Sequence, residues 1–196
     1  MTIFVHETGP HDAGAVVLLH AVGTTGWMWE WQVTALESDL RVLVPDLPGH
    51  GRSAAVPWEA IGGTAALVAE LIAARAPSVR APVVGLSLGG YVAATLAATA
   101  PDVVASAIVS GVNVLPFPNP GRLRLMGALM APVAGEKEHD LTRRSPAEIA
   151  AAFPNGEARL APGVGHAWSG EKPDLFTAMI RAHLSGSALP GTLTHA

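Results

Sequence analysis

Short runs of β-branched and other apolar residues recur along the chain, and segments of helical character separate them. These runs occupy residues 15–19, 42–44, 83–84 and 103–109. Uninterrupted apolar runs of this length are typical of parallel strands buried on both faces of a sheet. The segments between them predict helices over residues 27–36, 64–76 and 88–100. Together they predict an α/β fold, a doubly wound and mostly parallel sheet with helices on both faces.

The second half of the chain carries weaker signals of the same kind. Ser-Pro-Ala-Glu at 145–148 predicts an N-cap at Ser145, followed by a helix to about residue 152. A further strand is expected over residues 157–161, and a last helix over residues 174–184.

These elements predict one domain over residues 1–184, followed by a loose tail over residues 185–196. Residues 111–134 fit the pattern poorly, because four prolines and a short amphipathic piece stand where a lid and another core strand are expected. Only residues 131–134 can supply that strand. Either the lid is reduced or absent and the strand is short, or part of the protein is missing from this sequence.

The composition supports a compact globule and narrows the possible partners. The chain has 196 residues, of which 49% are hydrophobic and 14% charged, and its net charge is −4. Without a run of Lys and Arg, we expect neither nucleic acid nor a membrane as partner. No signal peptide or spanning segment is recognisable, which predicts a cytoplasmic protein. The oligomeric state stays open.

Ser87 is the first candidate for chemistry. It stands in Gly85-Leu86-Ser87-Leu88-Gly89, between an apolar strand and a continuous small, apolar helix that Pro101 ends. A serine between glycines can occupy a tight strand-to-helix turn that exposes its hydroxyl as a nucleophile. The alternative is that Ser87 only caps the helix.

His166 is the best candidate for the base that this hydroxyl needs. It lies in Gly163-Val164-Gly165-His166, directly after the strand expected to end near Ala161. Loops at the carboxyl ends of parallel strands line the active crevice of such sheets. The alternative is an ordinary exposed loop histidine.

Cofactor chemistry finds little support. Gly49-His50-Gly51-Arg52-Ser53-Ala54 matches a loose dinucleotide fingerprint, but Pro57 and Trp58 interrupt any helix that would follow. The chain has no phosphate-binding Gly-Lys-Ser/Thr loop, no cysteine and no helical pair of metal-binding histidines. We expect neither cofactor nor metal.

Four motifs in order resemble those of the α/β-hydrolase family of serine esterases, lipases and lactonases. They are the following segments: His20-Ala21-Val22-Gly23, Asp46-Leu47-Pro48-Gly49-His50-Gly51-Arg52-Ser53, the Ser87 motif and Gly165-His166. The resemblance implies a triad in the chain order nucleophile, acid, histidine.

The acid is expected in Gly135-Glu136-Lys137-Glu138-His139-Asp140. In similar hydrolases the acid comes three residues after such a glycine, which points to Glu138. Asp140 and Glu136 remain alternatives, and the cluster is also compatible with a merely solvated surface.

Two backbone N–H groups are expected to hold the oxyanion. Leu88 follows the nucleophile at a helix N-terminus, and the resemblance places the second donor at Val22. Ala21 stands where the family commonly has glycine, which matters if the loop needs a positive φ. At least one of Trp27, Trp29 and Trp31 should face the crevice, and Trp27 is our candidate substrate contact.

The sequence therefore predicts a serine hydrolase that cleaves a small carboxylic ester or lactone through an acyl-enzyme. The alternative is a weakly active or non-hydrolytic protein on the same fold that binds small molecules.

Overall fold

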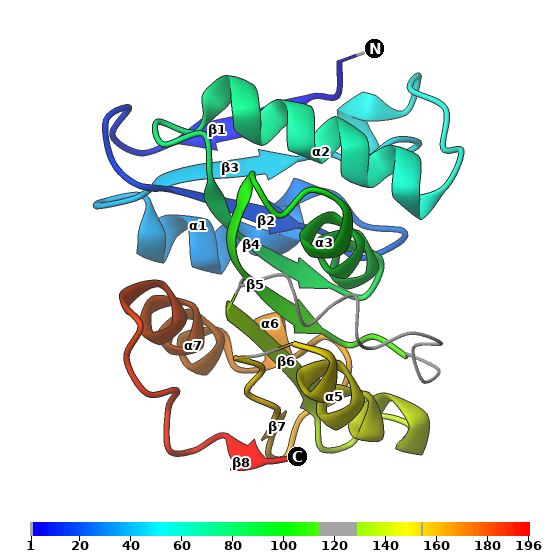
Figure 1. The fold of residues 1–196 in the computed structure, drawn as a ribbon, viewed down its shortest axis with the longest axis vertical. Coiled ribbons are helices and arrows are strands. Elements are labelled where there is room, and N and C mark those ends of the chain that lie inside the picture. The colour runs from blue at the N-terminus through cyan, green and yellow to red at the C-terminus, as the bar shows by residue number, and fades with distance from the viewer. Residues whose placement is uncertain (1, 114–128, 154) are drawn as a thin grey trace.

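A single sheet runs through the molecule in the order β1-β3-β2-β4-β5-β6-β7-β8 (Figure 1). The computed structural model describes residues 2–113, 129–153 and 155–196. The strands within these ranges are β1 (Val5–Thr8), β2 (Ala15–Leu19), β3 (Arg41–Pro45), β4 (Ala81–Leu86), β5 (Val104–Ser110), β6 (Leu129–Gly135), β7 (Arg159–Ala161) and β8 (Thr194–His195). Neighbours from β3 to β7 are parallel, while β1 and β8 are antiparallel edge strands.

Helices cover both faces of this sheet (Figure 1). One face carries α2 (Ile61–Arg75), α3 (Leu88–Thr99) and α5 (Asp140–Ala152). The other face carries α1 (Glu30–Leu36), α6 (Trp168–Glu171) and α7 (Pro173–Ser185). Two 3₁₀ turns, Gly26–Trp29 and Gly51–Ser53, lie in the loops after β2 and β3. The predicted doubly wound fold is confirmed.

Strand β2 shows why the apolar runs form central strands. All five of its residues are buried. Val17 and Leu19 pack into the hydrophobic cluster on one face, and Val16 and Leu18 into the cluster on the other. Burying each such side chain contributes about 1.5–3 kcal/mol, so a strand that is apolar on both faces is most stable in the middle of the sheet.

The difficult segment 111–134 contains all of strand β6 except its last residue, Gly135. Strand β6 spans seven residues and pairs with β5 from Ser106↔Leu129 to Ser110↔Val133, with Pro132 opposite Val109. The prediction of a short strand at 131–134 is therefore corrected, because pairing with both neighbours outweighs the poor local propensity. The rest of the predicted reduced lid, residues 114–128, lies outside the described residues.

The helix predicted to begin after an N-cap at Ser145 starts six residues earlier than expected. His139 occupies the cap position, where its ring accepts a hydrogen bond from the N–H of Leu141. Asp140 follows in the first turn, where its negative charge interacts favourably with the helix dipole and stabilises the helix. Ser145 lies in the helix interior and donates its hydroxyl to the Leu141 carbonyl. The Ser-Pro start signal was wrong here: Pro146 lies inside the helix, although an interior proline removes one backbone hydrogen bond.

The predicted loose tail is packed against the domain. Leu189 and Leu193 are buried in the cluster that contains α7, and β8 pairs with β7 through Arg159↔His195. The long helix predicted over residues 27–36 is divided instead, with a 3₁₀ turn before α1.

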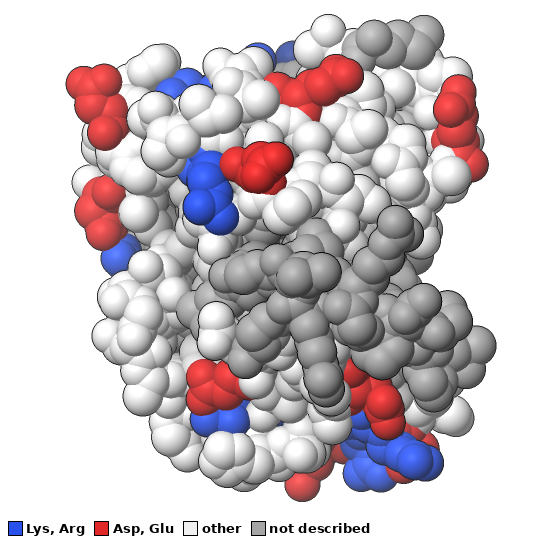
Figure 2. All heavy atoms as spheres, in the orientation of Figure 1, with Lys and Arg blue, Asp and Glu red and all other residues white. Residues whose placement is uncertain are grey.

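Charged side chains form small, separate groups on the face seen in Figure 2. Within the described residues, no helix is both long and apolar enough to cross a membrane. That part of the chain also holds no cluster of three His, Cys, Asp or Glu side chains suited to a metal ion.

Candidate active site

Ser87 occupies the sharp turn between β4 and α3. Its φ of 55° and ψ of −115° make it one of two described non-glycine residues with positive φ. Such a conformation costs roughly 1–3 kcal/mol and persists only where the surroundings enforce it. Here the N–H of Ser87 donates to the carbonyl of Ser110 at 2.8 Å, and its carbonyl accepts the N–H of Tyr91 at 3.0 Å.

The glycines beside Ser87 allow backbone segments to approach closely. A Cβ on Gly85 would overlap the backbone of Gly89, and a Cβ on Gly89 would overlap the carbonyl of Leu19. The N–H of Gly89 also donates to the carbonyl of His20 at 3.0 Å. The turn therefore requires small residues, and it lies against the loop that begins at His20.

Glu138 and His166, 28 residues apart in the chain, are hydrogen-bonded. His166 Nδ1 lies 2.8 Å from Oε2 of Glu138, whose other oxygen accepts the N–H of Gly135 at 2.9 Å. The Glu138 side chain is only 3% exposed, whereas that of His166 is 50% exposed. The hydrogen bond that His166 donates to Glu138 raises the pKa of His166, although partial burial opposes this shift. The ring thus has a fixed orientation, and Nε2 is left for other partners.

The two alternative acids have other partners. Glu136 accepts the N–H of Gly163 at 2.8 Å, and Asp140 pairs with Arg143 at 3.0 Å. Of the three candidate acids, the structure brings Glu138 to the histidine.

His166 lies against Gly111, which directly follows β5, the strand next to β4, after which Ser87 stands. A Cβ built on Gly111 would lie 2.8 Å from Cε1 of His166, and Gly111 directly follows Ser110, the partner of the Ser87 N–H. Among the described residues, no hydrogen bond joins the hydroxyl of Ser87 to the imidazole of His166. Catalytic hydrogen bonds are often long without substrate and tighten when it binds.

Two contacts here escaped sequence reasoning. Gly111, at φ 63°, provides the space that the His166 ring occupies. The indole N–H of Trp168 donates to the Ser110 hydroxyl at 2.8 Å in the buried interior, which ties the histidine loop to β5. A glycine directly after an apolar strand was the only signal that could have pointed to Gly111.

In the loop expected to hold the oxyanion, Ala21 does not adopt a positive φ, so it carries no strain of that kind. Positive φ falls on Gly23, at 74°, and not on Ala21. Val22 is 66% exposed, and Leu88 begins α3 directly after Ser87. His20 is fully buried. Asp46 accepts the N–H groups of Gly26 and Arg52 and so joins the loop after β2 to the loop after β3.

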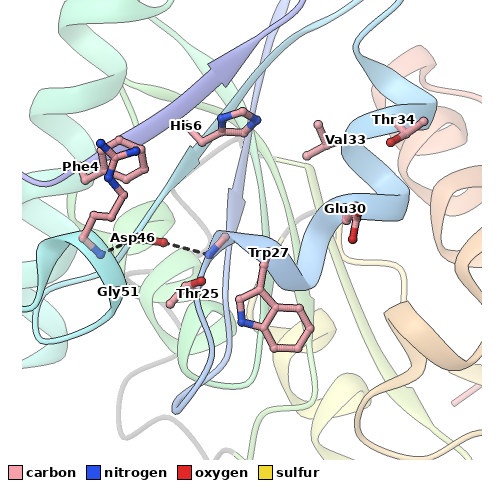
Figure 3. Close-up of a pocket in the computed structure, with 11 residues that line it drawn as sticks. Phe4, His6, Thr25, Trp27, Glu30, Val33, Thr34, Asp46 and Gly51 are labelled. Atoms are coloured by element: carbon pink, nitrogen blue, oxygen red, sulfur yellow. Dashed lines mark hydrogen bonds between the residues drawn. The ribbon is translucent and has the colours of Figure 1, made fainter.

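Trp27 is 68% exposed and lines a cavity of about 570 Å³ (Figure 3). The other walls include Phe4, His6, Glu30 and Arg52, whose guanidinium stacks 3.8 Å above the Phe4 ring. Ser87 and His166 do not line this cavity. Trp29 is fully buried and Trp31 is 65% exposed.

The structure combines a parallel sheet, a serine in a strained strand-to-helix turn, and a carboxylate–imidazole pair that follows later strands. This combination is the one expected of an α/β-hydrolase. Over residues 16–158 the chain matches the alpha/beta hydrolase family, and it belongs to that family.

Individual relatives share about half of the chain. The pimeloyl-[acyl-carrier protein] methyl ester esterase of Vibrio atlanticus is 38% identical over 55% of this chain and 39% of its own length. The 3-oxoadipate enol-lactonase 1 of Acinetobacter baylyi is 34% identical over 47% of this chain and 34% of its own length. The chain thus matches well under half the length of these curated relatives. A hydrolase from Pseudomonas aeruginosa PA01 shares the fold, with a TM-score of 0.79 at 22% identity over 92% of this chain and 93% of that one.

Proposed function

We propose that this protein is a serine hydrolase that cleaves carboxylic esters or lactones through an acyl-enzyme. The observation that carries the proposal is the 2.8 Å hydrogen bond between His166 and the buried carboxylate of Glu138, in a chain that also holds Ser87 at positive φ at the end of β4. A carboxylate that is buried against an imidazole, with its second oxygen on a backbone N–H, is suited to fix one tautomer of the ring.

In the proposed reaction, the Ser87 hydroxyl attacks the substrate carbonyl while Nε2 of His166 takes its proton. Glu138 accepts the Nδ1–H and stabilises the imidazolium that forms. The N–H groups of Val22 and Leu88 donate to the oxyanion. His166 then gives its proton to the leaving alcohol, and a water molecule, activated by the same ring, hydrolyses the acyl-enzyme. The catalytic groups in this scheme are side chains and backbone N–H groups of the chain, and the water comes from solvent.

The substrate class rests on the relatives. One acts, by name, on a methyl ester and another on an enol-lactone. Both reactions open an acyl–oxygen bond, so the same serine, imidazole and oxyanion donors serve either. Trp27 lines a cavity that neither Ser87 nor His166 lines. In the proposal, its side chain would therefore contact a part of the substrate distant from the reacting carbonyl.

The proposal is tested by hydrolysis of p-nitrophenyl acetate, butyrate and octanoate and of a γ-lactone, by the wild-type protein and by Ser87→Ala. We expect turnover by the wild type, greatest on the short esters if the lid is reduced, and a loss of most activity in Ser87→Ala. Wild-type protein that acylates stoichiometrically without turnover would favour the alternative of a binding protein.

A further inference from the structure

The Ala21 carbonyl is held by several donors. Its oxygen lies 2.8 Å from Nδ1 of His20, 2.7 Å from the Thr24 hydroxyl and 3.3 Å from the Thr24 backbone nitrogen. Nε2 of His20 accepts the N–H of Leu47 at 2.9 Å, so the ring proton is on Nδ1 and is donated to Ala21. Burial lowers the pKa of His20, which keeps this ring neutral.

These donors also orient the N–H of Val22, because it belongs to the same peptide group as the Ala21 carbonyl. In a trans peptide the C=O and N–H bonds point in opposite directions, and no described peptide bond is cis. Fixing the carbonyl toward His20 and Thr24 therefore fixes the Val22 N–H on the opposite side of the peptide plane.

Met28 holds the other end of Ala21. The N–H of Ala21 donates to the Met28 sulfur at 3.2 Å, and the same sulfur lies 3.2 Å from the Thr24 hydroxyl. A hydroxyl carries one proton, and the shorter contact of 2.7 Å to the Ala21 carbonyl takes it. The sulfur thus accepts from the backbone and packs against the hydroxyl. The loop is joined to the nucleophile turn through the bond from Gly89 to His20.

We propose that Thr24 and Met28 are positioning residues that hold the Val22 N–H as an oxyanion donor, an inference that rests on the proposed hydrolase function. An oxyanion donor is effective when its direction is fixed before the reaction, so that no reorganisation is needed in the transition state. Neither residue touches the substrate in this role. Both act through the Ala21–Val22 peptide.

The test uses Thr24→Val, which removes the hydroxyl at nearly constant volume, and Thr24→Ser, which restores it. Complete loss of an oxyanion donor costs about 10²–10³-fold in kcat, so we expect Thr24→Val to lower kcat by about tenfold or more with little change in KM. Thr24→Ser should recover most of the rate. Met28→Leu keeps the volume and removes a single weak hydrogen bond, and should cost between about two- and tenfold. Thr177→Val is the matched control, because Thr177 lies on α7 and its hydroxyl takes no part in this loop.

A second readout does not depend on turnover. In ¹⁵N-labelled protein whose Ser87 carries a phosphonate, the Val22 amide proton should lie downfield, bonded to the phosphonate oxygen. It should do so in the wild type and Thr24→Ser and move upfield in Thr24→Val. The thermal unfolding midpoint of Thr24→Val, compared with that of the wild type, distinguishes a folded protein with a misdirected loop from a misfolded protein.

Two results overturn the inference while leaving the hydrolase function intact. One is an active wild type with a Thr24→Val variant of unchanged kcat and unchanged Val22 amide shift, and the other is a Thr24→Ser variant as slow as Thr24→Val. A wild type that neither hydrolyses the esters nor accepts the phosphonate contradicts the proposed function itself, and the positioning role falls with it.

Discussion

Replacement of Glu138 by glutamine would test the imidazole tautomer on which the proposed mechanism depends. In the structure one carboxylate oxygen accepts the N–H of Gly135 and the other accepts Nδ1–H of His166. A glutamine has only one oxygen. If this oxygen stays on the Gly135 N–H, the amide NH₂ faces His166 and requires an unprotonated Nδ1. The ring proton then moves to Nε2, which can no longer accept a proton from Ser87.

The expected loss is large. A wrong tautomer of this kind can lower kcat by about 10⁴-fold, which corresponds to about 5 kcal/mol of transition-state stabilisation. The pH dependence should change as well. The hydrogen bond to Glu138 raises the pKa of His166 in the wild type, so activity should be lost as the pH falls through a value above 6.5, and in Glu138→Gln this acid limb should move to lower pH.

The assay is kcat and KM for p-nitrophenyl acetate as a function of pH, with Glu136→Gln and Asp140→Asn as controls. Both control carboxylates have partners other than His166, so each variant should stay within about tenfold of the wild type. The reasoning is refuted if Glu138→Gln keeps wild-type kcat, or if Asp140→Asn alone abolishes turnover.

Two further predictions concern Gly111 and His183. Gly111→Ala would place a Cβ 2.8 Å from Cε1 of His166 and strain a residue at φ 63°; kcat should fall by about 10²-fold through displacement of the ring, and unchanged kinetics would contradict this. Burial lowers the pKa of His183 to about 4, whereas the unfolded chain titrates near 6.5. The unfolded state therefore binds more protons between pH 6.5 and 4, and the wild type should lose about 3 kcal/mol of stability across that window. Urea unfolding of His183→Leu should lack this loss, and an equal loss in that variant would be contrary evidence.

The central strands and Ser87 could be predicted because their signals are local. Val16 and Val17 pack against opposite faces, so a continuous apolar run identifies a central strand. Glycines around a serine between a strand and a helix indicate the turn in the same way. The edge strands β1 and β8 escaped prediction, because they are short and partly polar and depend on pairing with a neighbour for their conformation.

The supporting contacts of the site could not be predicted, because they depend on the meeting of distant segments. Nothing near Gly111 in sequence indicates that the His166 ring needs its space. The hydrogen bond from Trp168 to Ser110 joins residues 58 positions apart. Ser145 and Pro146 show the opposite failure, in which a good local start signal gives way to an earlier cap at His139.

The central claim is that Ser87 is the covalent nucleophile, and intact-mass analysis after reaction with a fluorophosphonate tests it most directly. The wild type should gain one adduct per chain, peptide mapping should place it on Ser87, and Ser87→Ala should remain folded and unlabelled. An adduct on another residue, together with an active Ser87→Ala variant, would contradict the claim.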